Sequence, residues 1–194
     1  MRSAKMERNT SETKIKVEVV IDGEGKCTVD TGVGFLDHML NLFSRHGMFD
    51  LEISAKGDLE VDEHHTVEDL GFVMGQAFDK ALGERKGITR YGFFLLPMDE
   101  ALAQVAVDLG GRPYLQYIAE FRREKVGELS TELVRDFFEA FARGCRANVS
   151  VTLLAGENDH HKAEAIFKAF ARAMRSACEM DARQKGIPST KGEI

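Results

Sequence analysis

The sequence lacks the features that mark a membrane or secreted protein. No apolar run is long enough to span a bilayer, and no charged segment followed by an apolar one forms a leader. The three cysteines, Cys27, Cys145 and Cys178, form no CxxC pair. We therefore expect a protein of the reducing cytoplasm that has no membrane partner.

Basic residues are outnumbered, with 26 lysines and arginines against 32 acidic residues. The net charge is −6 and no stripe of clustered lysine and arginine is present, which argues against nucleic acid as the main partner. An anionic ligand must therefore be bound by local groups. What the chain does contain is 43% hydrophobic residues over 194 positions, enough for the core of one compact protein or of two small tandem units.

Four of the six histidines lie in two copies of one motif, His64-His65-Thr66-Val67-Glu68 and His160-His161-Lys162-Ala163-Glu164. The shift that carries His64 onto His160 also carries Leu70 onto Ile166 and Phe78 onto Met174. The chain is therefore internally duplicated. Apolar positions recur at three and four residues after each motif, so each His-His pair is predicted to open a helix with one buried face.

The spacing within the motif suits metal binding. At about 100° per residue, adjacent histidines diverge, whereas His64 and Glu68 lie roughly 40° apart and away from the apolar stripe. We expect their side chains to point off the core. One ion would be held by His64 and Glu68 and a second by the His160 and Glu164 pair. His65 and His161 would cross to the other ion, and further ligands would come from another element or another subunit.

The remaining histidines, His38 and His46, lie in an expected helix over residues 35–47. Its counterpart in the second half runs through residues 136–144 and places Asp136 opposite His38. The repeat therefore indicates a third metal ligand at each of these two positions.

The coarse pattern predicts the order ββαβα, twice, in a two-layer arrangement with helices on one face of each sheet. The expected strands cover residues 15–21, 26–30, 48–55, 101–109, 113–119 and 149–154, with the first two forming a hairpin. The expected helices cover 35–47, 131–144 and 160–180, and a further helix begins at His64. Residues 1–87 would form the first repeat and 88–194 the second, joined near Gly83–Gly87 and sharing one core.

Several cationic groups suit a phosphate. Arg90, Arg112 and the tail Ser189-Thr190-Lys191-Gly192 offer guanidinium, ammonium and hydroxyl donors. Lys168 shares a helical face with His160 and Glu164, so a cation lies one turn beyond a metal ligand. A metal site bordered by cations suits a phosphorylated substrate. On spacing alone, Glu12 is an ordinary solvated carboxylate.

Five segments together resemble the imidazoleglycerol-phosphate dehydratase family over nearly the whole chain. They are Leu36-Asp37-His38-Met39-Leu40 with His46-Gly47, Asp62-Glu63-His64-His65-Thr66-Val67-Glu68-Asp69, Pro97-Met98-Asp99-Glu100-Ala101-Leu102-Ala103, Asn158-Asp159-His160-His161 through Arg172, and Pro188-Ser189-Thr190-Lys191-Gly192. The resemblance implies an α+β fold of the ribosomal protein S5 domain 2-like type. It also implies an octahedral homo-oligomer of 24 subunits with two Mn²⁺ per active site at subunit interfaces.

By this resemblance, one ion takes His38, His65, His160 and Glu164, and the other takes His64, Glu68, His161 and Asp136. Imidazole and carboxylate would equally accept zinc, iron, cobalt or nickel. The substrate-contacting positions match Glu12, His46, Arg90, Arg112, Lys168, Thr190 and Lys191, alongside the ligands His38, His64, Glu68 and His160. Asp136 and Gly110 depart from the family, which often has histidine and serine there.

The implied reaction is the dehydration of imidazole glycerol phosphate to imidazole acetol phosphate in histidine biosynthesis. Glu12 is the first candidate for the acid and base, and the metal-bound residues His65 and Glu164 are further catalytic candidates. Two other classes use the same ligands. A dimetal hydrolase would use a metal-bound hydroxide, and a structural assembly would use the metal only to join subunits.

Overall fold

The computed structural model describes all residues from 1 to 194 and shows two repeats of mixed α and β structure. The first repeat contains β1 (Ser3–Asn9), β2 (Thr13–Val20), β3 (Cys27–Asp30), α1 (Gly34–Gly47), β4 (Asp50–Gly57) and α2 (His64–Leu82). The second contains β5 (Tyr91–Met98), β6 (Ala101–Asp108), β7 (Tyr114–Ile118), the short β8 (Lys125–Val126) and β9 (Leu129–Ser130), α3 (Leu133–Cys145), β10 (Asn148–Ala155) and α4 (Asp159–Cys178). The duplicated, two-layer α+β fold is confirmed.

The four-stranded sheet of each repeat has one strand more than the sequence pattern predicted, and the second repeat also contains the separate two-stranded sheet of β8 and β9. Only Ala4 of β1 is buried, so this edge strand has no alternating apolar pattern from which a strand could be predicted. β5 has the opposite character, because it is apolar at almost every position and so has no period of two. Pro97 fits within β5 because β5 is also an edge strand.

The predicted hairpin between residues 15–21 and 26–30, which correspond to β2 and β3, is wrong. The strand order of the first sheet is β1-β2-β4-β3, so β4 lies between β2 and β3. β2 pairs antiparallel with β4, and β3 pairs parallel with β4 on its other side. The Asp50 carboxylate accepts hydrogen bonds from the backbone N–H groups of Glu24 (2.8 Å) and Lys26 (2.9 Å). These bonds hold the chain that leads from β2 to β3 against the start of β4.

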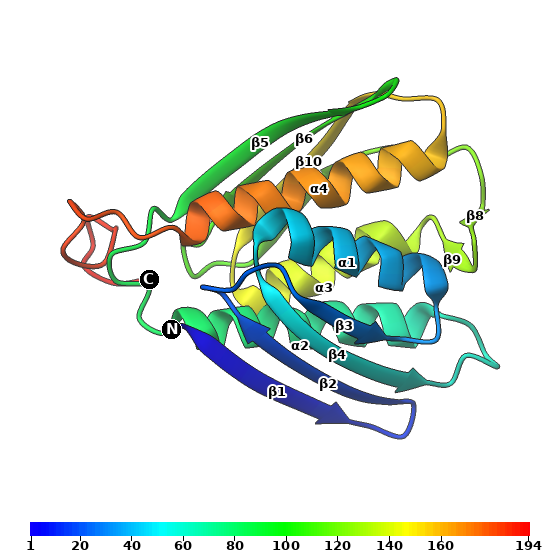
Figure 1. Cartoon of the computed structure of the whole chain (residues 1–194), viewed down its shortest axis with the longest axis horizontal. Helices are drawn as coiled ribbons and strands as arrows, with labels where there is room; N and C mark the ends of the chain where they lie inside the picture. The colour runs from blue at the N-terminus through cyan, green and yellow to red at the C-terminus, as the bar shows by residue number, and fades with distance from the viewer.

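The four helices lie between the two sheets, as Figure 1 shows. The second sheet has the equivalent order β5-β6-β10-β7. α2 packs on α3 and α1 on α4, while the outer faces of both sheets are turned to the surface. A single hydrophobic cluster of 50 buried residues joins both repeats. Phenylalanines form its centre, with the Phe170 ring 5.1 Å from Phe43 and 5.0 Å from Phe141.

This arrangement brings the N-terminal ends of α1 and α4 to the same end of the molecule as β8 and β9, opposite the C-terminal tail (Figure 1). Both His-His pairs open helices as predicted, since α2 begins at His64 and α4 at Asp159. None of the helices is long and apolar enough to cross a membrane.

Candidate active site

Local hydrogen bonds fix the start of each His-His helix. The Asp62 carboxylate accepts from the backbone N–H of His64 (2.8 Å), and the Asn158 side chain accepts from that of His160 (2.9 Å). Adjacent histidine rings are nearly perpendicular, at 88° for the first pair and 87° for the second. The two rings of a pair therefore face different surroundings, as the helix geometry predicted.

The first cluster joins α1 to α4. Oε1 of Glu164 lies 2.8 Å from Nε2 of His38 and 2.8 Å from Nε2 of His160. Donor atoms of these three residues all lie within 4.8 Å of one another. Two imidazole nitrogens and a carboxylate oxygen that converge in this way suit a divalent transition-metal ion, which would replace the protons that these hydrogen bonds require.

The prediction that the ligand side chains point off the core is wrong for Glu164. It is 6% exposed and lies in the crevice between α1 and α4, where Lys168 Nζ approaches its second oxygen to 2.6 Å. Burial alone would raise the pKa of Glu164, but the hydrogen bonds from Lys168, His38 and His160 outweigh it and lower this pKa to about 2. The carboxylate is therefore ionised and ready to bind a cation. The predicted cation one turn beyond the ligand is present.

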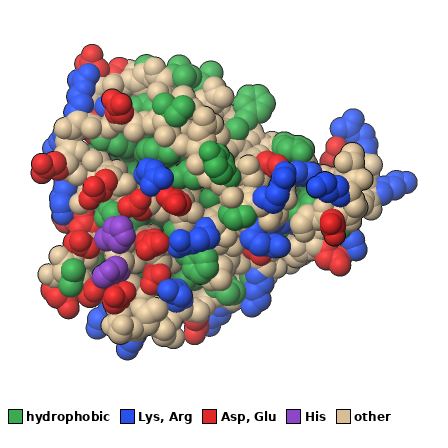
Figure 2. Space-filling view, turned by 180° about the vertical axis from the view of Figure 1, so that it is seen from behind, with side chains coloured by type: hydrophobic (Ala, Val, Ile, Leu, Met, Phe, Trp, Pro, Cys, Tyr) green, Lys and Arg blue, Asp and Glu red, His purple; other side chains and the backbone are tan.

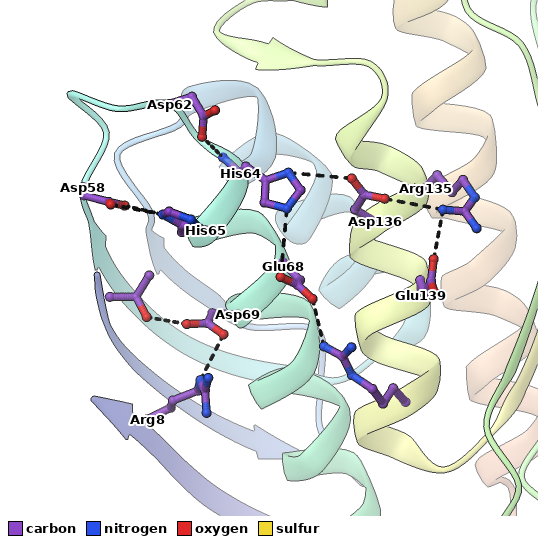
Figure 3. A network of polar contacts seen from close by, with 12 residues as sticks. Arg8, Asp58, Asp62, His64, His65, Glu68, Asp69, Arg135, Asp136 and Glu139 are labelled. Carbon is purple, nitrogen blue, oxygen red and sulfur yellow. Dashed lines mark hydrogen bonds and ion pairs between the residues drawn. The ribbon is translucent and has the colours of Figure 1, made fainter. Parts of the chain in front are cut away.

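The second cluster is looser and joins α2 to α3 (Figure 3). His64 lies between two carboxylates, with Nε2 4.0 Å from Glu68 and Nδ1 3.9 Å from Asp136. A cavity of about 150 Å³ is lined by these three residues together with Glu139, Ala140 and Arg143. Arg143 donates to Glu68 at 3.0 Å, as Lys168 does to Glu164 in the first cluster. The structure thus brings Asp136 to the His64 and Glu68 pair.

His65 and His161 lie outside both clusters. His65 Nδ1 is 3.0 Å from Asp58, and His161 Nδ1 is 2.8 Å from Glu100. The pKa of each histidine is raised, in each case chiefly by its carboxylate partner. Metal-binding histidines commonly use one ring nitrogen for a carboxylate and the other for the ion. Nε2 of His65 makes no hydrogen bond or ion pair, whereas Nε2 of His161 lies 3.6 Å from a carboxylate oxygen of Asp99.

Asp58 and Glu100 were not assigned a role from the sequence. Glu100 stands in one of the five family-like segments, which was a usable signal, whereas Asp58 lies in a turn without any pattern. The His161 hydrogen bond, with support from the backbone N–H of Asn158, lowers the pKa of Glu100 to about 2. Both residues orient a histidine ring.

A third group of residues surrounds a cavity of about 910 Å³ at the C-terminal end of α4. Arg90, Arg112, Thr190 and Lys191 all line it, as the sequence predicted for a phosphate-binding group. Arg90 is already engaged, with Asp108 at 2.7 Å and the carbonyl of Pro188 at 2.7 Å. The side chain of Arg112 is exposed and makes no hydrogen bond or ion pair, so it is available to a ligand.

Figure 2 shows histidines among acidic side chains at one end of the molecule and the cationic tail at the other. His46 lies on the α1 side of the first cluster, where burial and the positive charges of Lys168 and Arg172 lower its pKa. Glu12 lies in the exposed turn between β1 and β2. Its charge adds to that of Asp58 in raising the pKa of His65. The predicted site residues thus do not come together as one site within a single chain.

Comparison with known proteins points to one enzyme family. The family model described as imidazoleglycerol-phosphate dehydratase matches residues 31–174. The imidazoleglycerol-phosphate dehydratase of Trichlorobacter lovleyi is 55% identical over 193 residues, covering 100% of this chain and 99% of the relative. That of Oceanobacillus iheyensis is 52% identical over 194 residues, covering 100% of both.

Solved structures lead to the same family. The crystal structure of imidazoleglycerol-phosphate dehydratase from Staphylococcus aureus has a TM-score of 0.84 and 41% identity, covering 92% of this chain and 99% of that one. The enzyme from Pyrococcus furiosus has a TM-score of 0.84 and 36% identity, covering 97% of this chain and 100% of that one. The chain therefore belongs to the imidazoleglycerol-phosphate dehydratase family of hydro-lyases.

Proposed function

We propose that this enzyme dehydrates D-erythro-imidazole glycerol phosphate to imidazole acetol phosphate in histidine biosynthesis, with two divalent metal ions at each active site. The observation that carries the proposal is the convergence of His38, His160 and Glu164 on one point. Manganese is the metal that the family resemblance suggests. The three free cysteines are compatible with the reducing cytoplasm that we expect for this enzyme.

The proposed ligand sets follow the two clusters. His38, His160 and Glu164 would hold one ion together with His65, and His64, Glu68 and Asp136 would hold the other together with His161. Bound divalent ions would act as Lewis acids toward the imidazole ring of the substrate. Lys168 keeps the Glu164 carboxylate ionised, and Asp58 and Glu100 orient His65 and His161.

Proton transfer and phosphate binding are assigned to other residues. Glu12 is exposed and lies on the side of His65, so we assign it the role of acid and base at the glycerol chain. Arg112, Thr190 and Lys191 would bind the phosphate, with Arg90 holding the tail in place through the carbonyl of Pro188. Lys168 and His46 would line the substrate pocket beside the first cluster.

The distance between these groups supports an active site that is shared between subunits. His160 opens α4, whereas the backbone N–H of Arg90 donates to the carbonyl of Ala177 near the end of the same helix. At about 1.5 Å per residue these positions are roughly 25 Å apart, several times the length of a glycerol chain. One substrate cannot reach both groups in a single chain. We therefore propose a homo-oligomer, the 24-subunit assembly implied by the resemblance, with active sites at its interfaces.

The deciding experiment measures turnover of imidazole glycerol phosphate by the full-length protein after exhaustive chelation and after manganese is restored. We expect loss and recovery of the dehydrated product. Release of inorganic phosphate instead would indicate a dimetal hydrolase. Metal binding and assembly without turnover would indicate a structural role, and full activity without metal would overturn the proposed metal dependence.

A further inference from the structure

A buried carboxylate precedes each His-His pair. Glu63 is 6% exposed and Asp159 is 1% exposed, and the repeat places them at equivalent positions. Acidic residues are common at helix starts because they cap N–H groups there. Here that role is taken by Asp62 and Asn158, so Glu63 and Asp159 are directed to other partners.

Both carboxylates hold the same segment, residues 120–131, which includes β8 and β9. Asp159 accepts hydrogen bonds from the backbone N–H groups of Arg122 (2.9 Å) and Arg123 (2.8 Å). It also pairs with Lys162 at 2.7 Å, whose ammonium donates to the carbonyl of Glu120. The first part of the segment is therefore fastened to the start of α4.

Glu63 fastens the second part of the segment to the start of α2. Its carboxylate accepts from the backbone N–H of Ser130 at 2.7 Å and from the Ser130 hydroxyl at 2.5 Å, with Lys125 at 3.2 Å. Ser130 lies just before α3, whose first turn carries Asp136. The contact therefore fixes how far Asp136 lies from His64.

The segment also reaches the start of α1. A Cβ added to Gly127 would lie 3.3 Å from the Cβ of Phe35. The Phe35 ring in turn lies 5.1 Å from the ring of His160 and 6.3 Å from that of His38. Residues 120–131 thus meet the beginning of every helix that carries a candidate metal ligand. Burying two carboxylates is costly unless each is fully hydrogen-bonded, and here each receives several donors.

We propose that Glu63 and Asp159 are positioning residues that make segment 120–131 a rigid bridge between the two metal-binding clusters. Glu63 sets the geometry of the second cluster, and Asp159 sets that of the first. The proposal rests on the proposed function, since it assumes that both clusters bind metal.

The test is metal binding by Glu63→Gln and Asp159→Asn in the full-length protein, titrated with Co²⁺ by absorbance without substrate. We expect each variant to bind one ion about 10- to 100-fold more weakly, as is typical when a residue that supports a metal ligand is lost, and to bind the other ion normally. Ser130→Ala removes only the hydroxyl partner of Glu63 and should weaken the same ion as Glu63→Gln. If Glu63→Gln does not fold, Ser130→Ala still tests the proposal.

Two single-ion backgrounds assign the affected ion. Glu164→Ala retains only the second cluster, and adding Glu63→Gln to it should weaken binding of the remaining ion. Glu68→Ala retains only the first cluster, and adding Glu63→Gln to it should leave binding of the remaining ion unchanged. Glu60→Gln and Glu157→Gln make the same charge change at exposed positions of the same two connections and should leave both ions unchanged.

Equal weakening of both ions in step with a lower melting temperature would show a structural role and overturn the proposal. Unchanged binding of both ions would overturn it as well. A wild-type protein that binds two ions without dehydrating imidazole glycerol phosphate would refute the proposed function alone, because the selective losses would still be observed.

Discussion

At the scale of single residues, each candidate ligand glutamate has its own cation. Lys168 Nζ lies 2.6 Å from Glu164, and an Arg143 nitrogen lies 3.0 Å from Glu68. The first pair is largely buried, whereas both members of the second are exposed. Because the strength of an ion pair falls with exposure to water, the first cluster is the more preorganised of the two.

Asp136 stands where many family members have histidine, and it lies 3.9 Å from His64. A carboxylate oxygen is an acceptable ligand for manganese, so we expect Asp136→Ala to lose one ion and Asp136→His to retain both. Elemental analysis of the three proteins measures this directly. Two ions per subunit and unchanged activity in Asp136→Ala would show that position 136 is outside the metal shell.

Arg112 permits a clean test of phosphate binding because its side chain has no partner within the chain. A charge-assisted hydrogen bond contributes about 1.5–3 kcal/mol, so Arg112→Ala should lower kcat/KM by roughly 10- to 150-fold. Metal content and Tm should stay constant. Arg90→Ala should in addition lower Tm, because it releases Asp108 and the tail. Normal kinetics for Arg112→Ala would mean that this arginine is only a surface charge.

His46 should titrate below the ordinary histidine pKa of about 6.5. Burial and two nearby cations disfavour its protonated form, so its contribution to stability is complete above the unfolded pKa and is lost as pH falls toward the lower folded pKa. Arg172→Gln should raise the pKa of His46, whereas Arg175→Gln on the same helix should not. NMR titration of the metal-free protein measures the His46 pKa, with His46→Gln to assign the signal. An unchanged pKa in Arg172→Gln, or a raised one in Arg175→Gln, would contradict this account.

At the scale of elements, α2 and α3 approach closely because glycines replace side chains where they cross. A Cβ on Gly75 would collide with the carbonyl oxygen of Phe141, and one on Gly144 would collide with that of Phe72. This crossing joins the two repeats and brings Asp136 beside His64. The spacing of the helices is therefore set by backbone contact, which side chains would prevent.

Gly75→Ala should destabilise the protein by about 1–3 kcal/mol through overpacking. The sign is informative, because alanine in a free helix would instead stabilise it by up to about 1 kcal/mol. Gly186→Ala serves as the control, since a Cβ there meets nothing within 4 Å. Denaturant unfolding of the three proteins measures the difference, and a stabilised Gly75→Ala would contradict the close crossing.

At the scale of the whole molecule, the outer faces of the two sheets differ although the repeats are equivalent. The first face carries charged pairs such as Lys16 and Glu52 at 3.3 Å. The second exposes Tyr91, Phe93, Leu95, Tyr114 and Ile118, at 57%, 72%, 49%, 65% and 55%. Hydrophobic side chains also reach the surface on that side of the molecule in Figure 2. This exposed apolar face is the candidate for an interface of the proposed homo-oligomer.

Phe93→Glu should therefore reduce the mass of the proposed homo-oligomer, because a carboxylate would be buried without a partner at that interface. Lys16→Glu on the outer face of the first sheet is the control and should leave the mass unchanged. Analytical ultracentrifugation measures both. An unaltered assembly in Phe93→Glu would exclude this face from the interface, and its folding is checked by Tm.

The sequence by itself determined the duplication, the four helices and the positions of most candidate ligands. These features depend on local periodicity and on residue type, and both can be read directly from the sequence. His38 and Asp136 emerged because the repeat made each predict the other, and the structure places each beside a ligand pair. The sequence did not predict β1 and β5 because neither strand has an alternating apolar pattern. β1 buries one residue, and β5 is apolar at almost every position.

Tertiary structure alone decided the contacts between segments that are distant in sequence. β4 lies between β2 and β3 and pairs with both, and no pattern within residues 15–30 shows this, because the partner strand lies outside that segment. Glu164 is buried because α1 packs against α4, and helix periodicity cannot report what a second helix covers. Glu63 and Asp159 likewise look like ordinary acidic residues at helix starts. Their backbone N–H partners lie 36 to 67 positions away, and only the folded chain brings them together.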